Sequence, residues 1–150
     1  MDKTSIPHDA LVFVGDGVRA VFFRNRGPIQ KPDLAVEIVL EQKNPPTREQ
    51  GTDRPGRVHE RLGPRRSSVE DTDWHQLAED RFAVEIADAL YRLAHANRFQ
   101  RLIIVAPPKV LGTLRRTLHK EVLDRLEAEV PKELASYSLN GIRSELASWW

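Results

Sequence analysis

The chain has 150 residues, the size of a single domain, and 40% of its residues are hydrophobic while 30% are charged. Its 23 basic and 22 acidic side chains leave a net charge of +1, which excludes a protein that binds polyanions by overall charge. The absence of cysteine excludes disulfides, thiol nucleophiles and cysteine-based zinc sites. The first residues do not have the pattern of a secretory signal, and the longest apolar run, residues 102–106, is far shorter than the roughly 20 residues that cross a membrane. We expect a cytoplasmic protein without membrane contact.

The first third of the chain predicts three antiparallel strands. Residues 11–15 and 18–23 are apolar runs, and Asp16-Gly17 between them is typical of a type I′ hairpin turn, which needs positive φ at both central residues. After a break at residues 26–28, residues 34–40 are apolar around a lone Glu37, which favours a third strand buried mostly on one face. Together these runs predict a meander.

Residues from about 43 to 72 are predicted to form one long basic loop. Proline, glycine and serine interrupt this stretch, which has almost no aliphatic side chains. Five arginines and a single acid, Glu60, lie between Arg54 and Arg66, so the local charge is +4. Loops of this length are usually functional or disordered.

A long amphipathic helix is predicted after this loop. Asp73 fits its N-cap, Gln76 completes a capping-box pattern, and apolar side chains at spacings of three and four continue to about Asn97. Residues 101–106 then form an apolar run without alternation, as in a central strand covered on both faces.

Two more helices and a fifth strand complete the expected fold. One helix begins near Pro108, and the last covers about 139–148. Residues 122–130 fit either a strand or a helix, and we prefer an edge strand because apolar and charged residues alternate up to Pro131. The order predicts a single α/β domain with a mixed five-stranded sheet, in which crossover strands extend the antiparallel N-terminal meander and about three helices pack on the sheet.

The basic loop is the first candidate site. Arginine side chains offer forked donors that suit phosphate oxygens, so the loop predicts a segment that binds nucleic acid. The alternative is a solvated tether whose charges only keep it soluble, and the residues alone do not decide between the two. The candidate nucleic-acid-binding residues are Arg54, Gly56, Arg57, His59, Arg61, Arg65 and Arg66.

The end of the central strand is the second candidate site. Ligands of α/β sheets bind outside the carboxyl ends of strands, near helix N-termini that favour anions, so Pro107, Pro108 and Lys109 form a possible anion site. The simpler interpretation, which we favour, is that the two prolines only set the turn from strand to helix. Metal-binding histidine spacings, phosphate-binding glycine loops and nucleophile elbows are absent. The sequence therefore predicts no metal, no cofactor and no catalytic residues.

Several short motifs occur together along the chain and carry a resemblance. They are Val14-x-Asp16-Gly17 with Arg19-Ala20-x-Phe22-Phe23, residues 53–60 (Asp-Arg-Pro-Gly-Arg-Val-His-Glu), Arg81-Phe82-Ala83, and residues 103–108 (Ile-Ile-Val-Ala-Pro-Pro) before Leu111-Gly112-x-Leu114-Arg115. In this combination the chain resembles the bacterial host-attachment protein family (protein required for attachment to host cells). More distantly, it is similar to the middle domain of archaeal and eukaryotic class-I peptide-release factors, a mixed α/β domain with a loop before a long helix.

The resemblance to release factors implies a role at the ribosome. In those factors a Gly-Gly-Gln tripeptide in the loop enters the peptidyl-transferase centre, whereas this loop has Pro55-Gly56-Arg57. The resemblance thus implies a non-catalytic protein that binds ribosomal RNA or tRNA. One alternative is a protein-interaction module that influences attachment to host cells indirectly, with Trp149-Trp150 as aromatic contact area, and a second is a hydrolase that uses His59 or His75 beside the loop.

Overall fold

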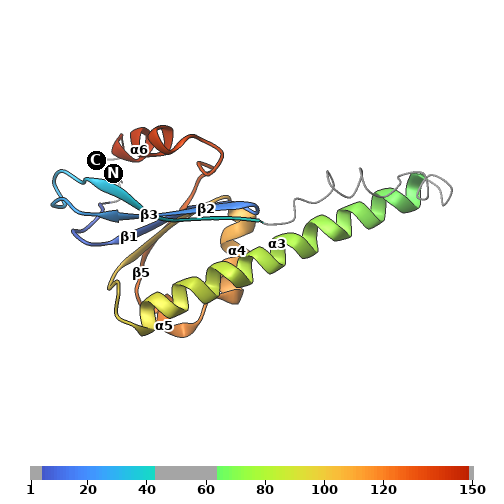
Figure 1. Cartoon of the computed structure of the whole chain (residues 1–150), viewed down its shortest axis with the longest axis horizontal. Coiled ribbons are helices and arrows are strands. Elements are labelled where there is room, and N and C mark those ends of the chain that lie inside the picture. Colours follow the sequence, from blue (N-terminus) through green and yellow to red (C-terminus); the bar gives the residue numbers. More distant parts are fainter. Residues whose placement is uncertain (1–4, 43–63, 149–150) are drawn as a thin grey trace.

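The centre of the molecule is a five-stranded mixed sheet with the strand order β3-β2-β1-β4-β5. The computed structural model describes residues 5–42 and 64–148, and the side chains of the second range from residue 74 onward. Helices cover both faces of the sheet, as Figure 1 shows. This arrangement confirms the predicted single α/β domain.

The N-terminal meander consists of β1 (Leu11–Gly15), β2 (Arg19–Asn25) and β3 (Leu34–Glu41), which pair antiparallel as predicted. The predicted type I′ turn between β1 and β2 is wrong, because neither Asp16 nor Gly17 has a positive φ. Instead, the Asp16 carboxylate accepts hydrogen bonds from the backbone N–H groups of Val18 at 2.9 Å and Arg19 at 2.8 Å. The Asp16 N–H also donates to the Arg19 carbonyl at 2.9 Å, so Asp16 is the first residue of the turn, and the central residues are Gly17 and Val18.

The second half of the sheet is parallel. β4 (Leu102–Ala106) lies between β1 and β5 (Leu126–Pro131) and is parallel to both, and all five of its residues are buried, as predicted for a central strand. The preferred strand at residues 122–130 is confirmed as the edge strand β5. A helix is present only in the preceding turn, where α5 (Lys120–Leu123) buries Val122.

Two apolar layers hold the helices against the sheet. One face of the sheet packs against α3 (Pro64–His95), α4 (Pro108–Thr117) and α5, with Phe13, Phe22 and Ile86 among its buried side chains. The other face packs against α6 (Leu139–Ala147), whose Ile142 and Leu146 are buried as predicted. Of the four helices in the described ranges, three are longer than a single turn, in agreement with the expected number.

The long helix α3 begins at Pro64, so the predicted N-cap at Asp73 is wrong. Residues 64–72 of the expected loop are helical, because proline fits the first helical position and neither glycine nor proline interrupts residues 65–73. The remaining residues of that loop, 43–63, lie outside the described part. At its other end, α3 stops two residues before the predicted boundary, where Asn97 has a φ of 58°.

The first part of α3 extends beyond the sheet (Figure 1). Its first buried side chain among those described is Ala78, 14 residues after Pro64. At 1.5 Å per residue, this stretch of helix is about 21 Å long. None of the helices in the described ranges combines the length and the apolarity needed to cross a membrane.

Candidate functional site

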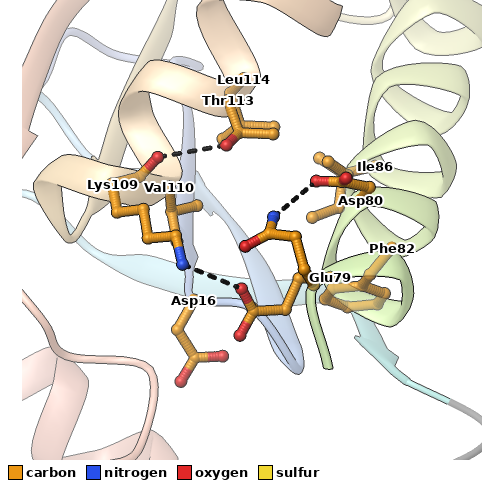
Figure 2. Close-up of a pocket in the computed structure, with 12 residues that line it drawn as sticks. Asp16, Glu79, Asp80, Phe82, Ile86, Lys109, Val110, Thr113 and Leu114 are labelled. Atoms are coloured by element: carbon orange, nitrogen blue, oxygen red, sulfur yellow. Dashed lines mark hydrogen bonds and ion pairs between the residues drawn. The ribbon is translucent and has the colours of Figure 1, made fainter. Parts of the chain in front are cut away.

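A small cleft lies where β1 and β4 end, between the β1–β2 turn, α3 and the start of α4 (Figure 2). Because β1 and β4 are parallel neighbours, their carboxyl ends bring Asp16 and Lys109 to the same edge of the sheet. Buried apolar side chains, including Phe82, Ile86 and Leu114, line its inner wall. This edge is where α/β sheets usually bind ligands.

The β1–β2 turn and α3 lie in close contact at this cleft. A Cβ atom added to Gly17 would come within 2.8 Å of the Glu79 carboxyl group, so any other residue would push this side chain away. The end of β3 is tied to the same turn, since Gln42 donates hydrogen bonds to the carbonyl groups of Gly17 and Val18, both at 2.9 Å. The chain therefore leaves the described part at residue 42 from a fixed position beside the cleft.

The charged side chains of the cleft are mostly acidic. Lys109 Nζ lies 3.9 Å from Glu79 Oε1 and links α4 to α3, while Gln76 donates a hydrogen bond to Asp80 at 3.0 Å. The Asp16 carboxylate lines the same cleft. With side chains 70% and 39% exposed, the Lys109–Glu79 pair contributes at most about 1 kcal/mol. The lining thus contains three carboxylates and one ammonium group.

The predicted anion site lies at the rim of this cleft. Pro107 is the N-cap of α4, no side chain caps the helix start, and Pro108 occupies its first turn. Lys109 is directed toward Glu79, so an anion bound here would compete with that carboxylate. The anion site stays a prediction. The positions of Pro107 and Pro108 also fit the simpler interpretation, in which the two prolines only set the turn from strand to helix.

The predicted nucleic-acid-binding residues fall into two groups. Arg65 and Arg66 occupy the first turn of α3, at the end that extends beyond the sheet. The others lie outside the described residues: Arg54, Gly56, Arg57, His59 and Arg61. Trp149 and Trp150 are likewise outside them, and His75 is exposed on α3.

The acidic residues of the cleft were not predicted as candidates from the sequence. Glu79 and Asp80 belong to the polar residues of an amphipathic helix, and Asp16 was interpreted only as a turn residue. The packing of α3 on the sheet brings Glu79 and Asp80 beside Asp16, and no local pattern of the sequence contains this contact. Within the described part of the chain, no group of three or more histidine, aspartate or glutamate side chains is placed to hold a metal ion.

One charged contact fixes the back of α4 to the edge of the sheet. Arg115 Nε donates a hydrogen bond to Glu129 Oε1 at 2.9 Å, and the two side chains also form an ion pair. The hydrogen bond from Arg115 to Glu129, together with the charge of this carboxylate, raises the pKa of the guanidinium. Arg115 is therefore engaged by β5 and is not available to the cleft.

Comparison with known protein families identifies the family of this chain. The family described as "Bacterial archaeo-eukaryotic release factor family 12" matches residues 9–146, which is nearly the whole chain. The chain belongs to this family. The predicted similarity to release factors is confirmed at the level of the family, while the name of the host-attachment family stays a prediction.

Solved structures give more distant similarities. The crystal structure of an archaeal translation termination factor, aRF1, is 13% identical, with a TM-score of 0.47, and the match covers 90% of this chain and 32% of that one. A structure described as an archaeal protein is 14% identical, with a TM-score of 0.45, and the match covers 91% and 32% of the two chains. This chain thus spans about a third of the length of these structures. No curated protein matches the sequence.

Proposed function

We propose that this protein is a non-catalytic, cytoplasmic, ribosome-associated domain that contacts ribosomal RNA or tRNA through the basic segment, residues 54–66. Membership of a release-factor family over residues 9–146 supports a role at the ribosome. The charge of the segment supports RNA as the ligand, because its five arginines suit phosphate oxygens.

The projection of α3 is the observation that carries this proposal. The helix extends about 21 Å before Ala78, the first buried residue among its described side chains, and its first turn contains Arg65 and Arg66, which belong to the basic segment. The sheet and the helices that cover its two faces are too wide to enter a narrow site lined by RNA. The projecting end of α3 is narrow enough to enter it. The helix therefore carries two arginines of the segment away from the acidic cleft.

Hydrolysis of peptidyl-tRNA is not part of the proposed function. The basic segment contains Pro55-Gly56-Arg57 and has no Gly-Gly-Gln tripeptide, which is the motif that the resemblance associates with that reaction. We propose that the segment binds and occupies its RNA site without chemistry.

Salt-dependent co-sedimentation with purified ribosomes tests the proposal. Wild-type protein is compared with Arg57→Gln plus Arg61→Gln, and with a control of equal charge change, Arg116→Gln plus Lys120→Gln, which alters exposed cations of α4 and α5. We expect the first variant to bind more weakly and to reduce the slope of log affinity against log salt by about 1 for each phosphate that is no longer neutralised. Binding that persists at high salt, or that the segment variant leaves unchanged, contradicts the proposal.

A second candidate function rests on two exposed apolar side chains of α3. Leu77 and Val84 are 51% and 49% exposed, and their spacing of seven places them on one face of the helix. Such a face suits a protein partner, through which the chain would influence attachment to host cells indirectly. Pull-down from cytosol with and without RNase separates the two functions. A partner that resists RNase and no longer binds Leu77→Lys plus Val84→Lys favours the second.

A further inference from the structure

A second hollow lies at the other end of the parallel strands, where β1 and β4 begin. It has a volume of about 310 Å³ and is lined by residues 8–10, just before β1, and by residues 97–101, between α3 and β4. Ala10 and Phe99 are almost fully buried and form its apolar lining. We call this hollow the amino-end pocket.

The backbone of the amino-end pocket is held in place by two arginines. Asp9 and Asn97, which have φ values of 70° and 58°, are the two non-glycine residues with positive φ in the described ranges. Arg24 donates a hydrogen bond to the Asp9 carbonyl at 3.1 Å, and Arg125 donates to the Asn97 side chain at 3.2 Å and to the Phe99 carbonyl at 2.8 Å. The two segments that line the pocket are therefore fixed before any ligand arrives.

Two further arginines line the pocket and have no such structural task. The Arg98 guanidinium makes no hydrogen bond or ion pair with any residue that the structure describes. Arg101 Nη1 lies 3.7 Å from Glu127 Oε1, longer than a hydrogen bond, and its side chain is 57% exposed. Both guanidinium groups keep most of their donors available.

The remaining polar side chains of the pocket add mainly hydrogen-bond donors. Asn97 uses its oxygen to accept from Arg125, which leaves its NH₂ group as a donor, and the Gln100 amide makes no hydrogen bond with the described residues. His8 donates from Nδ1 to the Gly27 carbonyl at 2.8 Å, so its other nitrogen is open. Asp9 is the one carboxylate among the lining residues. A pocket rich in donors suits a ligand rich in acceptors.

We propose that the amino-end pocket binds a backbone phosphate of RNA, held by the guanidinium groups of Arg98 and Arg101. Arginine suits phosphate because its planar fork donates two parallel hydrogen bonds. This inference rests on the proposed function, to which it adds a second RNA contact. The pocket lies at the start of β1. Residue 42, from which the chain continues toward the basic segment, lies beside the turn at the other end of β1. One RNA would therefore be held at two separate places.

Binding of unfractionated tRNA to the full chain, measured over a series of salt concentrations, tests the pocket. Arg98→Gln plus Arg101→Gln removes the two guanidinium groups, and Arg116→Gln plus Lys120→Gln removes the same charge elsewhere. We expect the pocket variant alone to weaken binding several-fold and to lower the salt slope by about 1 to 2. Unchanged binding, or equal weakening by the control variant, overturns the inference.

A second measurement addresses the pocket directly and guards against a folding defect. Inorganic phosphate is added to ¹⁵N-labelled protein, and we expect the backbone amide signals of residues 98–101 to shift in the wild type and not in the pocket variant. The spectrum of the variant must otherwise match that of the wild type. Phosphate that leaves these signals unmoved in the wild type also overturns the inference.

The two proposals fail in different ways. If Arg57→Gln plus Arg61→Gln weakens tRNA binding while Arg98→Gln plus Arg101→Gln does not, the proposed function is supported and the phosphate site in the pocket is rejected. If only the pocket variant weakens binding, the pocket stands and the basic segment loses its role. If the wild type binds neither ribosomes nor tRNA, both the proposed function and the RNA contact are overturned.

Discussion

Asn25 is the one polar or charged residue among the described side chains that is fully buried, and all its hydrogen-bonding groups have partners. Its NH₂ group donates to the carbonyls of Ile6 and Pro7, and its oxygen accepts from the N–H groups of Gly27 and Asp33. We expect Asn25→Leu to lower the free energy of unfolding by about 3 kcal/mol, because it leaves four buried or partly buried backbone groups unpaired. Urea denaturation measures this decrease, with exposed Gln100→Ala as a control, and a decrease equal to that of the control contradicts the role of Asn25.

Gly15, the last residue of β1, and Gly17, in the following turn, lack a side chain for different reasons. A Cβ atom at Gly15 would lie 2.3 Å from the buried Phe13 ring, whereas at Gly17 it would meet the partly exposed Glu79 side chain. We expect Gly15→Ala to cost about 2 kcal/mol and Gly17→Ala less than about 1 kcal/mol, because Glu79 can rotate away. Thermal unfolding of both variants measures the difference, and equal destabilisation contradicts this explanation.

At the scale of elements, α3 has a packed part and a projecting part. Ile86 is 1% exposed within the core, while Leu77 is 51% exposed. We expect Ile86→Ala to cost about 3 kcal/mol and Leu77→Ala much less. Chemical denaturation of the two variants tests this.

The division of α3 also predicts its local stability. Amide exchange with solvent slows where side chains are packed in the core. We expect slow exchange from about Ala78 onward and fast exchange before it, measured by hydrogen–deuterium exchange. Uniform protection over residues 64–95 would mean that the projecting part of α3 packs against another part of the protein. This result contradicts the proposal that the start of α3 carries arginines to RNA.

The elements themselves could be predicted from the sequence because each rests on local patterns. The apolar runs at β1, β4 and α6 located these elements to within a few residues. The start of α3 could not be predicted, since Asp73 and Gln76 imitate a capping box inside a continuous helix. The acidic residues of the cleft and the amino-end pocket could not be predicted for another reason. The packing of α3 on the sheet brings Glu79 and Asp80 beside Asp16, and the pairing of β1 with β4 brings residues 8–10 beside residues 97–101. No local pattern of the sequence contains either contact.

At the scale of the molecule, the two ends of the parallel strands differ in charge. The cleft at the carboxyl ends is lined by Asp16, Glu79 and Asp80 against Lys109, whereas the amino-end pocket is lined by Arg98 and Arg101 with a single carboxylate. A net charge of +1 conceals this separation. RNA that contacts the amino end would be repelled by the cleft, which gives its approach a preferred orientation.

The absence of Gly-Gly-Gln leads to a prediction for the whole protein. We expect no release of peptide from ribosomes that carry peptidyl-tRNA, even at protein concentrations that saturate binding. Release is measured with a labelled peptide, and a known release factor serves as the positive control. Release above background that disappears in His59→Ala would instead support a hydrolase.

The pairing of β1 with β4 also has a consequence for how the chain folds. Leu11 pairs with Leu102, and the contact is parallel, so the centre of the sheet joins residues from distant parts of the chain. Closing so long a loop is entropically costly, and folds rich in such contacts form slowly. During synthesis, one edge of β1 has no partner strand until β4 has left the ribosome. We expect the nascent chain to be most prone to aggregation in this interval.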